Sequence, residues 1–126
     1  MRRVLAVAGS DPLCGAGVEG DVLTLAQCGV QPLAVCAAVV AQDSTGVGRF
    51  AATPTAVFLE ALTRVLADGR PDAVKLGMLA TPTRAGHVEE RLCSSNVRVV
   101  VIDPVLAGGG AGGGALAAAA MPVALL

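Results

Sequence analysis

Four short apolar runs limit the fold of this chain more than any other feature of its sequence. They cover residues 4–8, 33–41, 73–76 and 97–102 and are mostly continuous rather than alternating. Continuous apolar runs of this length are typical of parallel strands that are buried on both faces of a sheet. The sequence therefore predicts four strands, with the intervening segments as connections.

Three helical patterns lie between these runs. Their apolar stripes consist of Val18, Val22, Leu25 and Ala26; of Phe58, Leu62, Val65 and Leu66; and of Ala85, Val88 and Leu92. Thr53-Pro54 and Thr81-Pro82 precede the second and third stripes as a cap and a first-turn proline would, and Asp68-Gly69 provides a stop. Strands that alternate with helices in this way predict right-handed βαβ units and a doubly wound, mostly parallel sheet.

Composition excludes several classes of protein. The chain has 126 residues, slightly under an average domain of about 150 residues, so we expect a single core. Because 54% of the residues are hydrophobic, the chain as a whole is not disordered. A net charge of −1 and only two aromatic residues leave neither a basic surface nor a stacking platform, so we expect no nucleic-acid partner.

Two uncharged stretches have the length of a membrane span, residues 22–42 and 104–126. Glutamine, glycine and proline residues interrupt the first stretch, and six glycines between residues 108 and 114 interrupt the second, which disfavours a spanning helix. The start, Met1-Arg2-Arg3, resembles the charged region of a signal peptide, but the apolar run of residues 4–8 is too short to continue one. We therefore expect a cytoplasmic protein without a membrane segment.

The cysteines and the single histidine do not predict a metal site. Cys14, Cys28, Cys36 and Cys93 lack the two-residue spacing of zinc ligands, and we expect them to be buried free thiols in a reducing compartment. His87 precedes Glu and Arg residues at helical spacing, so we expect it on a solvated helical face.

Small and polar residues follow every predicted strand. They occupy residues 9–17, 42–46, 77–79 and 103–104. In doubly wound sheets, ligands bind in the crevice beyond the carboxyl ends of the strands, so these segments predict a small-molecule pocket. Turns are polar and rich in glycine in any case, and the pattern alone leaves both interpretations open.

The identity of these residues carries a family resemblance. The motifs are AGSDP at residues 8–12 with GAG at 15–17 and Asp21, VAQDSTGV at 40–47, KLGML at 75–79 and VVIDPV at 100–105. In this order and spacing they resemble the hydroxymethylpyrimidine and phosphomethylpyrimidine kinases of thiamine synthesis, more than the related pyridoxal kinases. The resemblance implies the ribokinase-like fold, an α/β architecture of three αβα layers around a mostly parallel sheet.

The resemblance also implies roles for seven residues. The substrate-binding residues would be Gly9, Ala16, Asp21, Gln42, Met78 and Val105. An amide such as Gln42 offers the donor and the acceptor that an aminopyrimidine edge requires, and Met78 would form a flexible apolar wall. Asp103 would lie near the nucleotide phosphates and the magnesium ion. For Asp21 a surface helix position, and for Met78 a place in the core, are the structural alternatives.

The implied activity is the phosphorylation of 4-amino-5-hydroxymethyl-2-methylpyrimidine and of its monophosphate, with ATP and Mg²⁺. The resemblance covers residues 4–123 but only the amino-terminal half of the family's domain. We therefore expect residues 1–126 to form one partial, truncated domain, whose catalytic residues would belong to the carboxyl-terminal half.

The chain also departs from the family's pattern. A Gly/Ala-rich low-complexity segment covers residues 107–120, and its first part, residues 107–114, replaces a usual lysine-serine-glycine segment of the family. Leu13, Cys14 and Gly20 replace other usual residues. A non-catalytic pyrimidine-binding module and a fragment without independent function therefore stay open as alternatives. Because half a sheet leaves an edge and an apolar face uncovered, we expect a homo-oligomer or a complementing chain.

Overall fold

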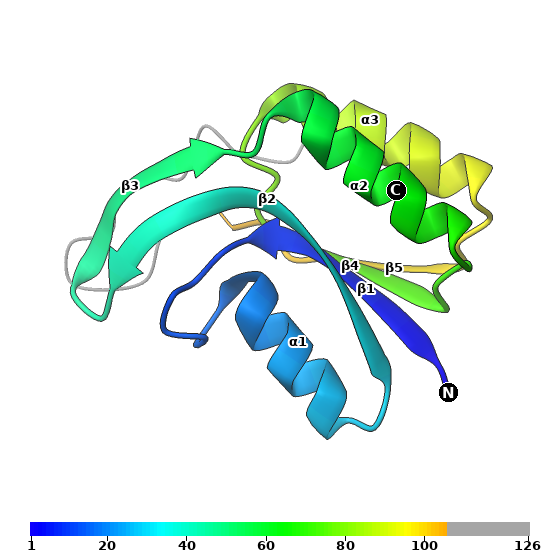
Figure 1. Cartoon of the computed structure of the whole chain (residues 1–126), viewed down its shortest axis with the longest axis horizontal. Helices are drawn as coiled ribbons and strands as arrows, with labels where there is room; N and C mark the ends of the chain where they lie inside the picture. Colours follow the sequence, from blue (N-terminus) through cyan, green and yellow to red (C-terminus); the bar gives the residue numbers. More distant parts are fainter. Residues whose placement is uncertain (106–126) are drawn as a thin grey trace.

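The computed structural model describes residues 1–105 and shows a five-stranded sheet with helices on both faces (Figure 1). The elements in chain order are β1 (Arg3–Gly9), α1 (Gly17–Gln27), β2 (Gln31–Asp43), β3 (Gly46–Ala52), α2 (Thr55–Ala67), β4 (Ala73–Leu76), α3 (Pro82–Ser94) and β5 (Val99–Ile102). Helix α1 covers one face of the sheet, and α2 and α3 cover the other. The predicted three-layer αβα architecture is confirmed. The predicted Gly/Ala-rich segment, residues 107–120, lies outside the described residues.

The strand order is β3-β2-β1-β4-β5. Strand β1 pairs in parallel with β2 and β4, and β4 pairs in parallel with β5, so all four predicted strands are present. In this register Lys75 of β4 lies beside Ala6 of β1 and Val101 of β5. The carboxyl ends of these four strands therefore meet at one edge of the sheet.

Strand β3 was not predicted. Residues 42–46 were expected to form a loop after the second strand, but β2 continues to Asp43 and returns as the antiparallel β3. The Asp43 carboxylate accepts hydrogen bonds from the backbone N–H of Thr45 (2.8 Å) and of Gly46 (3.3 Å), which closes the turn. The β2–β3 hairpin extends away from the helices (Figure 1).

The main core lies between the sheet and the layer of α2 and α3. Its buried members are Leu5, Val7, Val35, Ala37, Phe58, Leu62, Leu66, Val74, Leu76, Leu79, Ala85, Val88 and Leu92. The second and third predicted stripes supply most of the helical residues among them. Helix α1 contributes less, since Val18 is its one buried residue.

A buried arginine joins several of these elements. Arg84 is 1% exposed, in the first turn of α3. Its guanidinium donates to the carbonyl oxygens of Ala37 (2.6 Å), Leu79 (3.3 Å) and Thr53, and it lies 4.7 Å from the centre of the Phe58 ring. Burial lowers the pKa of this guanidinium. Arg84 thus connects β2, the end of β3 and the segment after β4.

The structure tests the predicted ends of α2 and α3. Thr53 does not cap α2, because its hydroxyl donates to the Cys36 carbonyl (2.9 Å), and the N-cap residue is Pro54. Thr81 is the N-cap residue of α3, but it makes no capping hydrogen bond with its side chain. Helix α2 ends at Asp68-Gly69 as predicted.

The cysteines are more accessible than predicted. All four are free, but Cys14, Cys28 and Cys93 are exposed because they lie in a loop or near the end of a helix. Cys36, in β2, is partly buried, and burial raises the pKa of its thiol. His87 is exposed on α3, as predicted. Among residues 1–105, no helix is both long enough and apolar enough to cross a membrane.

Candidate functional site

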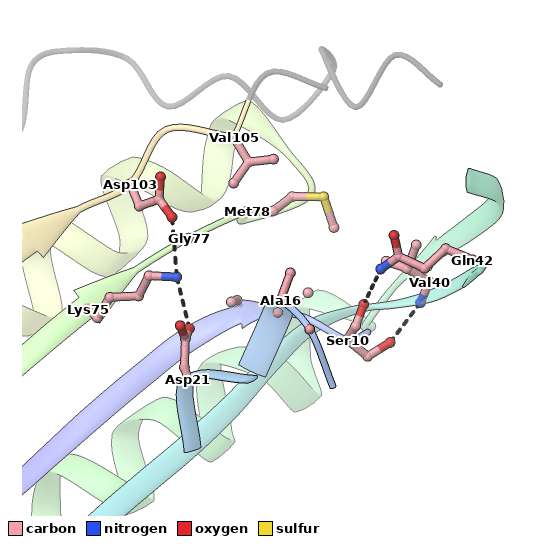
Figure 2. A pocket seen from close by; sticks show the side chains of 14 residues that line it. Ser10, Ala16, Asp21, Val40, Gln42, Lys75, Gly77, Met78, Asp103 and Val105 are labelled. Atoms are coloured by element: carbon pink, nitrogen blue, oxygen red, sulfur yellow. Dashed lines mark hydrogen bonds and ion pairs between the residues drawn. The ribbon is translucent and has the colours of Figure 1, made fainter. Parts of the chain in front are cut away.

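A cavity of about 410 Å³ lies at the carboxyl ends of the parallel strands, in the size range of small-molecule pockets (Figure 2). The loop after β1, the start of α1, the end of β2 and the segments after β4 and β5 form its walls. The structure brings all seven predicted site residues to this cavity: Gly9, Ala16, Asp21, Gln42, Met78, Asp103 and Val105. Their roles toward a ligand stay predictions.

Asp11 shapes the loop on one side of the cavity. Its carboxylate is buried and accepts hydrogen bonds from the backbone N–H groups of Leu13 (3.0 Å), Gly15 (3.1 Å) and Ala16 (2.9 Å). Its own N–H donates to the Glu19 carboxylate (2.8 Å). These bonds satisfy backbone groups that precede α1 and hold Ala16 at the cavity wall.

Gly17 allows this loop to enter α1. Its φ is +62°, in the left-handed region. A Cβ atom at Gly17 would lie 2.6 Å from the Gly9 carbonyl oxygen and 2.9 Å from the Asp11 nitrogen. Both neighbours are backbone atoms, so no side-chain movement could relieve the overlap.

Ser10 fastens the same loop to β2 (Figure 2). Its N–H donates to the Ala38 carbonyl (2.8 Å), its hydroxyl oxygen accepts from the Val40 N–H (2.9 Å), and its carbonyl accepts from Gln42 Nε2 (3.2 Å). The amide orientation of Gln42 is therefore set by the backbone of Ser10. Within residues 1–105 no hydrogen bond engages its Oε1, which can act as an acceptor.

Met78 and Val105 provide an apolar wall. Both pack with Val40 in a small cluster at the end of the sheet. A Cβ atom at Gly9 would overlap the Met78 methyl group, so the glycine leaves room for this side chain. The cavity thus places an apolar surface beside the amide of Gln42.

Three charged side chains lie on the side of the cavity away from Gln42 (Figure 2). Lys75 Nζ lies 2.9 Å from Asp21 Oδ2 and 3.5 Å from Asp103 Oδ2. The side chains of Lys75 and Asp21 are 23% and 21% exposed, whereas Asp103 is 61% exposed. Asp103 is aligned by its N–H, which donates to the Leu76 carbonyl (2.8 Å) and extends the β4–β5 pairing past the strand end.

The residues present fit one kind of metal site only. Within residues 1–105, no group of three or more His, Cys, Asp or Glu side chains is arranged to hold a metal ion. Mg²⁺ in nucleotide sites needs only one or two protein carboxylates, with phosphate and water oxygens completing its shell. The exposed carboxylate of Asp103 suits that arrangement.

Ser10 and Lys75 are functional candidates that the sequence reasoning did not single out. Both belonged to recognised motifs, but neither was given a role. A signal for Lys75 was available, because it is the chain's only lysine and lies within a short apolar strand. A charged residue is retained at such a position chiefly where it is paired.

Comparison with known proteins places this cavity in a family context. The family model described as phosphomethylpyrimidine kinase matches residues 11–122. The hydroxymethylpyrimidine/phosphomethylpyrimidine kinase of Salmonella typhimurium is 37% identical over 108 residues, which are 84% of this chain and 41% of that protein. The thiamine biosynthesis multifunctional protein ThiED of Corynebacterium glutamicum is 38% identical over 104 residues, 82% of this chain and 14% of that protein. The chain therefore spans less than half the length of either relative.

Solved structures agree in fold. Phosphomethylpyrimidine kinase from Clostridium difficile superposes with a TM-score of 0.79 at 32% identity, over 82% of this chain and 48% of that one. Pyridoxal kinase from Staphylococcus aureus, solved in complex with AMP-PCP and pyridoxal, gives a TM-score of 0.76 at 33% identity, over 83% of this chain and 40% of that one. The ribokinase-like fold that the sequence motifs implied is confirmed.

Proposed function

This chain belongs to the phosphomethylpyrimidine kinase family, and on that basis we propose that its cavity binds 4-amino-5-hydroxymethyl-2-methylpyrimidine for phosphorylation by ATP. The monophosphate of the same pyrimidine would be the second substrate. The relatives whose names carry these two activities support this assignment.

The observation that carries the proposal is the pairing of Gln42 with Met78 in one cavity. Gln42 Nε2 is engaged by the Ser10 carbonyl, so Oε1 is available to accept a hydrogen bond from the amino group of the pyrimidine. Met78 would pack against the face of the ring, and Asp21 would accept a hydrogen bond from the opposite edge. Gly9 and Ala16 would let the backbone approach the ligand closely.

The nucleotide would enter on the side of Asp103. We propose that this carboxylate helps to hold Mg²⁺ together with phosphate oxygens of ATP. The ion would supply charge neutralisation during phosphoryl transfer, which depends chiefly on positioning and electrostatics. The AMP-PCP in the pyridoxal kinase structure supports a nucleotide ligand for this fold.

Binding without turnover is the second candidate. Lys75 is the one cationic side chain that lines the cavity within residues 1–105, and both of its carboxylate neighbours already engage it. Phosphoryl transfer needs cationic groups on the transferred phosphate, and the described part of the cavity offers no second side chain for this purpose. A pyrimidine-binding module that needs another chain for catalysis fits this observation.

We further propose that the protein works in the cytoplasm as a homo-oligomer or with a complementing chain. Its four cysteines are free, which suits a reducing compartment. Val99 and Val101 of β5 are 51% and 55% exposed at one edge of the sheet. A second subunit that covers this strand would remove the exposed apolar surface.

A turnover experiment separates the two candidates. The folded chain is incubated with magnesium-ATP and the hydroxymethylpyrimidine, and the product is measured by mass spectrometry. In parallel, calorimetry measures the binding of the hydroxymethylpyrimidine and, for comparison, of pyridoxal. Product that disappears in Asp103→Asn, but not in the exposed α3 control Glu90→Gln, supports the kinase. Tight binding of the pyrimidine without product supports the binding module. A folded chain that binds neither pyrimidine nor ATP contradicts both candidates.

A further inference from the structure

The single lysine of this chain lies between two acidic side chains at the edge of the sheet (Figure 2). Its ammonium is 2.9 Å from Asp21 Oδ2, on α1, and 3.5 Å from Asp103 Oδ2, just after β5. Three separate elements therefore meet at this one nitrogen. Their sequence positions are far apart, so the contact exists only in the folded chain.

The surroundings of Lys75 explain why its charge needs partners. On either side of it in β4, Val74 and Leu76 are fully buried. The Lys75 side chain is 23% exposed and points to the other face of the sheet, where it meets Asp21 of α1. Holding an ammonium group at this depth costs free energy unless carboxylates compensate for the lost hydration.

Gly77 keeps space for the ammonium group. A Cβ atom at Gly77 would lie 3.2 Å from Lys75 Nζ and 3.0 Å from the Ala8 Cβ. Contacts of this length are tighter than side chains normally make, so a residue larger than glycine would press on Lys75. The backbone after β4 is thus compatible with the lysine in its observed position.

We propose that Lys75 is a positioning residue that fixes the direction of the Asp21 carboxylate and links it to Asp103. This inference rests on the proposed function, in which Asp21 contacts the pyrimidine and Asp103 faces the nucleotide. Lys75 binds Asp21 through Oδ2, and within residues 1–105 no hydrogen bond engages Oδ1, which can accept one from the substrate. Without the ammonium group, two carboxylates would face one cavity with no cation between them, and mutual repulsion would turn them apart.

The link makes the two ends of the cavity interdependent. If Asp103 turned toward a bound magnesium-nucleotide, Asp21 would be the one carboxylate left beside the Lys75 ammonium. The Lys75 ammonium therefore interacts with both carboxylates. We expect a change at Asp103 to reach Asp21 through Lys75.

The test is a double-mutant cycle in pyrimidine affinity, measured by calorimetry on the full chain, with unfolding by urea recorded for every variant. Lys75→Met keeps an unbranched side chain, one heavy atom shorter than lysine, and removes the charge, and it should weaken binding about tenfold. Lys75→Met combined with Asp21→Asn should bind no more weakly than Asp21→Asn alone, because the lysine acts through that carboxylate. Independent, multiplying losses of affinity would overturn the proposal, as would wild-type affinity in Lys75→Met.

A second readout does not depend on binding or on the folding of Lys75→Met. Because the chain has one lysine, ¹³C-lysine labelling gives one side-chain ¹³Cε signal in the NMR spectrum. This signal should shift in Asp21→Asn and in Asp103→Asn, and stay in place in the control Glu90→Gln on α3. An unchanged signal in both Asp variants would overturn the link. If the wild-type chain fails to bind the pyrimidine, the proposed function fails, and this signal still decides whether Lys75 joins the two carboxylates.

Discussion

At the scale of single residues, the loop of residues 9–17 shows how backbone geometry builds the cavity. The Asp11 carboxylate accepts hydrogen bonds from N–H groups of this loop, and Gly17 adopts a left-handed backbone conformation where the chain enters α1. Gly17 lines the cavity, whereas Asp11 does not. Both determine where Ala16, which lines the cavity, is held.

Gly17→Ala tests this view against a matched glycine. At Gly17 the new methyl group would meet two backbone atoms at a φ of +62°, whereas Gly29 has a φ of +73° with nothing within 4 Å. We expect Gly29→Ala to lower the free energy of unfolding by about 1 kcal/mol, and Gly17→Ala by more than about 2 kcal/mol. Urea denaturation measures both, and equal losses would contradict the close approach at Gly17.

The sequence predicted seven of the residues at the cavity but not Lys75. Seven residues reach one cavity because motifs that follow parallel strands necessarily converge at one sheet edge. Lys75 was overlooked because periodicity treats β4 only as an apolar run. The role of Lys75 depends on Asp21 and Asp103, which are distant in the sequence, so no local sequence pattern shows that the three side chains meet.

At the scale of elements, the β2–β3 hairpin is the main difference between prediction and structure. Asp43 and Gly46 were interpreted as loop residues at a strand end, yet they form a turn between two paired strands. The segment after this turn, residues 46–52, has weak alternation and two glycines, so hydrophobic periodicity did not reveal it. The places of the parallel strands and helices, whose apolar patterns are strong, were predicted correctly, but β5 was expected to be buried and its valines are exposed.

The Asp43 carboxylate gives this hairpin a pH dependence. Hydrogen bonds from the Thr45 hydroxyl, and then from backbone N–H groups, lower the pKa of Asp43 below its usual 3.8. Because the folded-state pKa is the lower one, the ionised carboxylate stabilises the turn above the usual pKa, and this contribution is lost as pH falls through the folded-state pKa.

Thr45→Ala should therefore raise the pKa of Asp43 toward its usual value. Carboxyl ¹³C NMR titration measures this pKa directly. Ser44→Ala, which keeps the hydroxyl and N–H of Thr45, is the control and should leave the pKa of Asp43 unchanged. An equal change in both variants would mean that the Thr45 hydroxyl does not cause the shift.

Arg84 forms hydrogen bonds to segments that are far apart in the sequence, which a local sequence pattern cannot predict. Replacing it with methionine removes a charged donor from the carbonyls of Leu79 and Thr53 and the stacking on Phe58. We expect Arg84→Met to lower the free energy of unfolding by about 2–3 kcal/mol in urea denaturation. Arg91 lies on the same helix, is only partly buried, and donates hydrogen bonds to the Thr63 hydroxyl and the His87 carbonyl, so Arg91→Met should cost less than about 1 kcal/mol. A loss at Arg84 no larger than the loss at Arg91 would show that the buried guanidinium does not join these elements.

At the scale of the whole molecule, strand β5 leaves apolar surface uncovered. Val99 and Val101 align in register with Ala73 and Lys75, so they point to the face of the sheet that carries α1. The chain spans 41% of the Salmonella kinase, and the sequence alone could not specify what lies against this face.

We expect the purified chain to self-associate through this surface at micromolar concentration. Val101→Glu should raise the monomer fraction measured by light scattering, because a carboxylate on this face opposes apolar contact. Val57→Glu places the same charge at a similarly exposed valine on α2 and should change the monomer fraction little. A monodisperse wild-type monomer would contradict the prediction.

The central claim is that the cavity at the strand ends binds a hydroxymethylpyrimidine. Titration of 4-amino-5-hydroxymethyl-2-methylpyrimidine into the ¹⁵N-labelled chain, followed by NMR, tests it most directly. Our account predicts saturable amide shifts at Gly9, Ala16 and Gln42, which line the cavity, and little change at His87 on the far face of α3. Shifts that do not saturate, or that spread equally to α3, would contradict the claim.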